Sequence, residues 1–138
     1  MSVYGHVALG AAIGTLIPHP AAALAAAIAS HVPADLWSHY DVEIPWLEFL
    51  LAAAALFACG WVGGWRAPVI LGAMGGALPD LEHLAVALGF MKEERLLFPT
   101  HGRRRIRHGD ARPAGSVIAQ AAFAALMFVW VAWAPAFG

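Results

Sequence analysis

Apolar residues form five long stretches along the chain, separated by short segments rich in proline, glycine or charged residues. The stretches cover about residues 3–17, 21–39, 46–65, 67–90 and 114–137. Because a hydrocarbon core of about 30 Å requires about 20 helical residues, four of them are long enough to cross a bilayer. The first is shorter, and it either spans a thinned bilayer or packs as a tilted helix against the others. The pattern therefore predicts a single all-α domain over residues 1–138, an integral membrane protein with a compact bundle of about five transmembrane helices.

The composition favours a membrane protein over a soluble one. Hydrophobic residues make up 61% of the chain and charged residues only 12%, whereas soluble domains average about 25% charged residues. This balance excludes a disordered chain and a nucleic-acid-binding domain. The first basic residue is Arg66, so the first stretch lacks the charged n-region of a cleaved signal peptide. The one cysteine, Cys59, has no partner for an intrachain disulfide, and we expect a buried, inert thiol.

The basic residues predict the orientation. Every lysine and arginine except Arg66 lies between about residues 91 and 113, in the segment that joins the fourth and fifth stretches. The positive-inside rule places this basic loop in the cytoplasm. Counting back through the predicted helices then puts the N-terminus in the cytoplasm and the C-terminus outside.

This topology places nearly all the acidic residues and histidines on one side of the membrane. Ionisable groups at membrane depth usually face one another or a wet cavity, because burying them in lipid is costly. Residues 30–39 (SHVPADLWSH) and 76–83 (GALPDLEH) both place proline just before Asp-Leu and end in histidine, which suggests a weak internal repeat. Within the first of them, His31, Asp35 and His39 are spaced i, i+4 and i+8, so they share one helix face.

Histidine and carboxylate side chains are typical ligands of zinc, iron or manganese. The predicted ligands of a divalent metal, most simply zinc, are His6, His31, Asp35, Asp80, His83 and His101. They are too many for one tetrahedral ion, so either two ions bind or some of these residues orient the others. Glu82 is the candidate general base towards a metal-activated water. The residues His39, His108, Arg103 and Arg105 are candidates for orienting the ligands or binding the substrate.

Each of these residues also has a simpler interpretation. His6 and His39 could be interfacial side chains, and His31 or Asp35 could form a hydrogen bond between helices. Asp80 follows a proline and could be the N-cap of a helix. The arginines of the basic loop are explained equally well by topology and by anionic lipid headgroups.

Three short motifs resemble a known family. His6-Val7-Ala8-Leu9-Gly10, Gly76-Ala77-Leu78-Pro79-Asp80-Leu81-Glu82-His83 and Thr100-His101 are similar to motifs of the YdjM-like membrane-bound metal-dependent hydrolases of bacteria. The resemblance implies a multi-helix protein of the bacterial inner membrane with a metal centre and hydrolytic activity. This chain departs from the family pattern where Glu82 replaces the more usual aspartate. It departs again after His101, where arginines follow, so that His108 is a possible substitute for His101.

The leading hypothesis is a membrane-embedded hydrolase that cleaves a phosphoester or other bond of a lipid or lipid-linked substrate at the cytoplasmic interface. The chain has no His-Glu-x-x-His, Gly-x-Ser-x-Gly or Walker motif, so the common zinc-protease, serine-hydrolase and nucleotide-hydrolysing sites lack support. The alternatives are a non-enzymatic metal or haem protein, a transporter of metal ions or protons, and a structural subunit that oligomerises through its small-residue helix faces.

Overall fold

In the computed structural model, every regular element of the described residues 1–37, 44–101 and 113–134 is a helix. The long helices are α1 (Val3–Leu16), α2 (Pro20–Asp35), α3 (Pro45–Val62) and α6 (Pro113–Trp133). Two shorter ones, α4 (Ala67–Ala77) and α5 (Leu81–Ala87), follow α3 and are themselves followed by a 3-10 turn at Glu93–Arg95.

Proline sets the start of most helices. Pro20, Pro45, Pro68 and Pro113 each lie at the first or second helical position, where the missing N–H costs nothing and the fixed φ favours a helix. His19 also caps α2, because its ring accepts a hydrogen bond from the backbone N–H of Ala22 at 3.4 Å. The helix bounds therefore lie close to the predicted apolar stretches, except that the fourth stretch divides into two helices.

The break between α4 and α5 lies at residues 78–80, and the two helix axes differ in direction by 49°. Pro79 lies in this break, whereas Pro33 lies inside α2 and the helix continues past it to Asp35. The two segments that suggested an internal repeat therefore adopt different backbone structures.

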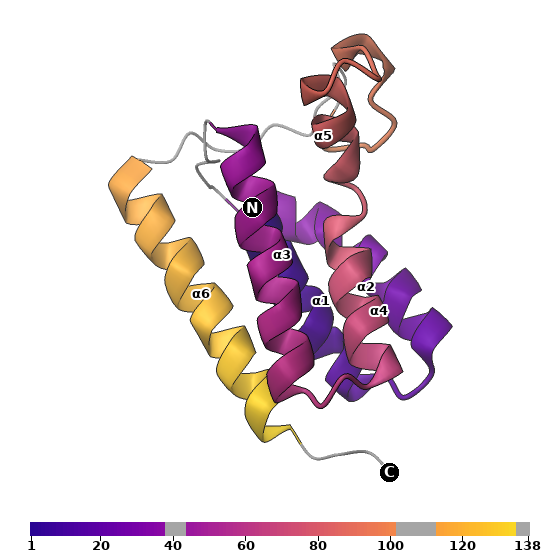
Figure 1. The fold of residues 1–138 in the computed structure, drawn as a ribbon, viewed down its shortest axis with the longest axis vertical. Coiled ribbons are helices and arrows are strands. Elements are labelled where there is room, and N and C mark those ends of the chain that lie inside the picture. Colours follow the sequence, from indigo (N-terminus) through magenta and orange to yellow (C-terminus); the bar gives the residue numbers. More distant parts are fainter. Residues whose placement is uncertain (38–43, 102–112, 135–138) are drawn as a thin grey trace.

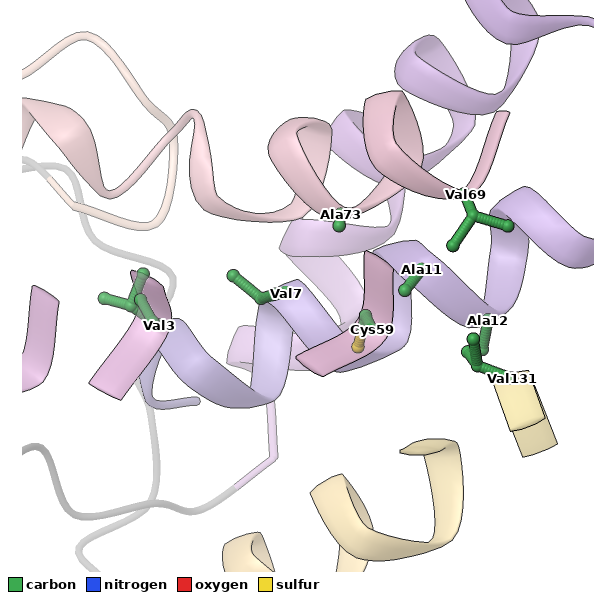
Figure 2. Close-up of a cluster of buried hydrophobic side chains, with 9 residues drawn as sticks. Val3, Val7, Ala11, Ala12, Cys59, Val69, Ala73 and Val131 are labelled. Atoms are coloured by element: carbon green, nitrogen blue, oxygen red, sulfur yellow. The ribbon is translucent and has the colours of Figure 1, made fainter. Parts of the chain in front are cut away.

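Helix α1 forms the centre of the bundle and packs against α2, α3, α4 and α6 (Figure 1). Its Val7 and Ala11 meet a core of small side chains from the other helices, including Val69 and Ala73 of α4 (Figure 2). Cys59 of α3 lies in this core with no exposed surface, and burial raises the pKa of its thiol to about 11. The prediction of a buried cysteine is confirmed.

Glycines let α1 and α4 pack with their backbones in contact. A Cβ added at Gly72 would overlap the carbonyl oxygen of Gly10, and one added at Gly76 would overlap the carbonyl oxygen of His6. The two helices can approach this closely only because both positions lack side chains. This contact also places the C-terminal end of α4 beside the start of α1.

The prediction of about five transmembrane helices is wrong. Among the described residues, only α6 contains a stretch long and apolar enough to cross a membrane, from Ser116 to Trp133, and the bent pair α4–α5 would add a second only if counted as one span. Helix α1 has 14 residues and α2 has 16, which is less than the about 20 that a bilayer requires. The apolar stretches were longer than the helices because they included caps and connecting residues.

Candidate metal centre

Among the described residues, six side chains that could bind a metal gather where α1 begins and α2 and α4 end. These helix ends lie towards one end of the bundle (Figure 1). His6 lies in the first turns of α1, and His31 and Asp35 lie in the last turns of α2. Asp80 lies at the break between α4 and α5, and His83 follows in α5. The sixth, His101, belongs to the segment after the 3-10 turn.

Most of this cluster is closed off from solvent. His6 and His31 have 1% and 0% of their surface exposed, and Asp35, Asp80 and His101 are also buried. His83 is exposed, so the cluster reaches the protein surface on one side. Three sets of side chains each offer ligand atoms within 4.8 Å of one another: His6, His31 and Asp80; His31, Asp35 and His101; and Asp80, His83 and His101. These buried histidines and aspartates could therefore hold a metal ion.

The partners of His31 and His101 determine which ring nitrogen is free. The Nδ1 atom of His31 lies 3.0 Å from the carbonyl oxygen of Gly76, and the Nδ1 atom of His101 lies 2.9 Å from Oε1 of Glu82. Since a carbonyl or a carboxylate can only accept, each Nδ1 atom must carry the hydrogen. The lone pair of each neutral ring is then on Nε2, and these two Nε2 atoms are 3.2 Å apart.

Two facing lone pairs require a cation between or beside them, and two carboxylates are placed to share it. Oδ2 of Asp35 lies 3.3 Å from Nε2 of His31 and 3.4 Å from Nε2 of His101. Oδ1 of Asp80 lies 3.5 Å and 3.4 Å from the same two nitrogens. Donors around a tetrahedral zinc ion with bonds of about 2.0–2.1 Å are about 3.3–3.4 Å apart. Each carboxylate oxygen therefore forms, with the two nitrogens, a triangle of the size of one face of a zinc site.

Without a metal, a proton supplies the positive charge. Burial by itself lowers the pKa of His31, but its hydrogen bonds to Asp35 and Asp80, and the charges of both carboxylates, raise it to about 9. Burial raises the pKa of Asp35, whereas hydrogen bonds from His101, His31 and His6 hold it well below its usual range. The pKa of His6 is lowered, chiefly by burial. In the metal-free protein, the positive charge of protonated His31 beside ionised Asp35 thus takes the place that a metal cation would fill.

Asp35 has several other partners. Its Oδ2 accepts a hydrogen bond from Oγ1 of Thr100 at 2.6 Å, and its Oδ1 lies 2.9 Å from Nε2 of His6. The amino group of Met1 is also 2.8 Å from Oδ1. Thr100 and Met1 were not among the predicted site residues. The Thr100-His101 pair was the available signal for Thr100, since it places a hydroxyl next to a predicted ligand.

Asp80 occupies the N-cap position of α5, but its side chain makes no capping hydrogen bond. Asp80 therefore stands where an N-cap residue would stand, but its carboxylate does not cap the helix. Its Oδ2 atom is buried and has no hydrogen-bond partner in the part of the chain that the structure describes. A buried carboxylate oxygen without a partner is costly, which is a reason to expect a ligand there.

Four further predicted residues, His39, Arg103, Arg105 and His108, lie outside the described residues. Comparison with protein-family models, curated proteins and solved structures gave no match.

Proposed function

We propose that the protein is a metal-dependent hydrolase whose divalent cation is bound by His31 and His101 together with the Asp35 and Asp80 carboxylates. The observation that carries the proposal is the pair of Nε2 atoms 3.2 Å apart, each with its Nδ1 hydrogen donated elsewhere. Metal-binding histidines usually donate the second ring N–H to a carbonyl or a carboxylate, and here one ring does each.

The donor set supports a catalytic ion over a purely structural one. Structural zinc sites commonly use thiolates, and the only cysteine, Cys59, lies in the apolar core. The exposed side chain of His83 gives the cluster an opening to solvent. When bound, a zinc, manganese or iron ion supplies Lewis acidity towards water and towards a phosphoryl or carbonyl oxygen. The protein's own side chains hold the ion, fix the ring orientations and exclude bulk water from the inner face.

A lipid or lipid-linked phosphoester is the substrate class we propose. Its support is the apolar surface of α6, where Ile118, Leu126 and Trp133 are 70%, 65% and 84% exposed. Large exposed apolar patches mark contacts with lipid or with other proteins. The similarity of three motifs to the YdjM-like hydrolases points the same way.

Haem binding has less support in the geometry, because Nε2 atoms 3.2 Å apart and flanked by carboxylates leave no room for a porphyrin between them. A carrier of divalent cations is the second candidate. Asp80 lies at the joint of the bent α4–α5 pair, and transporters often bind ions at interrupted helices.

The test is metal content together with hydrolysis. Wild-type protein purified without chelators should contain at least one equivalent of zinc, manganese or iron, measured by elemental analysis. Asp80→Asn should lose it, whereas His19→Ala, which removes an exposed histidine outside the cluster, should keep it. Folding of each variant is checked by circular dichroism.

Hydrolysis is then measured on phospholipid vesicles and on a soluble phosphodiester. Activity that disappears on chelation and returns with metal is the expected result. A metal-loaded protein that cleaves neither substrate but carries the ion into sealed vesicles would replace the hydrolase with the carrier. Absence of metal from the wild type would overturn both.

A further inference from the structure

The cluster offers more donors than one ion can use. Six side chains reach it, and a tetrahedral zinc ion takes four ligands. The three sets of potential ligands overlap, with each pair of sets sharing one residue: His31, His101 or Asp80. The identity of the shared residue decides which two sets can be filled at the same time.

A shared histidine cannot serve two ions in this structure. The second ring nitrogen of His31 is bonded to the Gly76 carbonyl, and that of His101 is bonded to Glu82. Each ring therefore has one nitrogen left for a metal. The set His31, Asp35 and His101 thus excludes both of the other sets, since it shares a histidine with each of them.

A shared carboxylate carries no such restriction, because its two oxygens can bind two ions. Only Asp80 is common to the other two sets, of which one adds His6 and His31 and the other adds His83 and His101. One oxygen of Asp80, Oδ1, faces the Nε2 atoms of His31 and His101 at 3.5 and 3.4 Å. The other, Oδ2, is buried without a hydrogen-bond partner among the described residues.

We infer that the centre binds two divalent ions that share the Asp80 carboxylate. The inference rests on the proposed metal-dependent function, but it assigns His31 and His101 to different ions in place of one shared ion and leaves Asp35 outside both ligand sets. The inner ion takes His6 and His31, and the outer ion takes His83 and His101. With His6 on the inner ion, Asp35 still keeps the hydrogen bond from Thr100.

The exposed His83 makes the outer ion the one that meets the substrate. Two divalent ions outweigh the charge of the carboxylates of Asp35, Asp80 and Glu82, so the loaded centre attracts an anion. Paired ions about 3.5–4 Å apart suit the displacement of a phosphoester, because they stabilise both the attacking and the leaving oxygen. A phosphodiester monoanion is therefore the substrate class that this centre favours.

The experiment is a zinc titration of the metal-free full chain by calorimetry, with elemental analysis after equilibrium dialysis as a second measure. The wild type should bind two equivalents. His83→Ala, on the exposed side of the cluster, should bind one, and His6→Ala should also bind one. Asp80→Asn should bind neither ion tightly. His19→Ala is the matched control and should bind two.

The outcomes separate the two proposals. One equivalent in the wild type overturns the second ion and leaves the proposed function standing, whereas no binding overturns both. Two equivalents in His83→Ala would overturn the assignment of the outer ion. With manganese in place of zinc, two ions this close give an exchange-coupled electron paramagnetic resonance spectrum, and two separate uncoupled spectra would contradict the shared carboxylate.

Discussion

At the scale of single residues, both carboxylate oxygens of Glu82 already accept hydrogen bonds, unlike those of a free general base. Its Oε1 atom accepts hydrogen bonds from Nδ1 of His101 at 2.9 Å and from the backbone N–H of Phe98 at 3.0 Å. Its Oε2 atom accepts from the N–H of Leu97 at 2.7 Å. The carboxylate thus ties the segment before His101 to α5 and fixes the ring with Nε2 facing the cluster. These contacts favour a positioning role for Glu82 over proton transfer.

We expect Glu82→Gln to weaken metal binding by about 10–100-fold, as loss of such an orienting carboxylate typically does. Glu82→Ala should weaken it further, since it also releases the backbone of Leu97 and Phe98. The measurement is competition with a chromophoric chelator, followed by kcat at saturating metal. Unchanged affinity with a large fall in kcat would instead assign Glu82 the predicted role of general base.

The candidate ligands were predictable from the sequence, but the side-chain contacts that join the start of the chain to distant helices were not. The i, i+4 spacing of His31 and Asp35 predicted that both lie on one helix face, and Nε2 of His31 is 3.3 Å from Oδ2 of Asp35. Glu48 of α3 and Gln120 of α6 accept hydrogen bonds from the first backbone N–H groups of the chain, at Val3 and Ser2. Val3 and Glu48 are separated by 45 positions in the sequence, and Ser2 and Gln120 are separated by 118. No local spacing in the sequence indicates contacts over such separations.

At the scale of helices, the sequence predicted where most of them lie because proline and glycine mark their ends. It did not predict that residues 67–90 would form two helices. Pro33, in the other segment of the suggested repeat, lies two residues before the end of α2 and does not interrupt it. A proline near the last turn removes little of the helix hydrogen bonding, whereas Pro79 lies in the break that follows α4.

The contact between α1 and α4 makes a prediction about stability. Gly72→Ala should lower the free energy of unfolding by about 1–3 kcal/mol, because the added methyl overlaps the backbone of Gly10 and forces the helices apart. Chemical denaturation of the wild type and the variant measures the difference. Gly5→Ala is the control, since its methyl meets only the flexible side chain of Met1 at 3.0–3.5 Å. Equal stability of Gly72→Ala and the wild type would contradict the observed close packing.

At the scale of the whole molecule, the apolar composition predicts several membrane spans, but the described residues contain only one candidate span, or two if the bent α4–α5 pair counts as one. Much of the buried core instead consists of small residues, such as Ala11, Ala27 and Ala73, that let short helices pack closely. Helix α6 differs, since only 17% of its stretch from Ser116 to Trp133 is buried. Composition counts apolar residues but does not distinguish those that face other helices from those that face outward.

We expect α6 to carry the contact of the protein with lipid. Leu126→Glu places a charge on its exposed face and should weaken binding to phospholipid vesicles by about 100-fold, since a charge within the hydrocarbon costs about 2.5–3.5 kcal/mol. Vesicle flotation measures the bound fraction. Leu97→Glu, at a side chain 86% exposed outside the helices, is the matched control and should bind like the wild type. Equal losses in both variants would mean that α6 is not the specific contact.

The ligands also have an order along the chain that bears on synthesis. His6 is made first, and His31, Asp35, Asp80 and His83 follow before His101. On the ribosome, the donor set therefore stays incomplete until His101 has left the exit tunnel, by which time α1 to α5 have all been made. Because the exit tunnel holds a few tens of residues, most of α6 (Pro113–Trp133) is made before His101 emerges, so the candidate donor set is completed only near the end of synthesis.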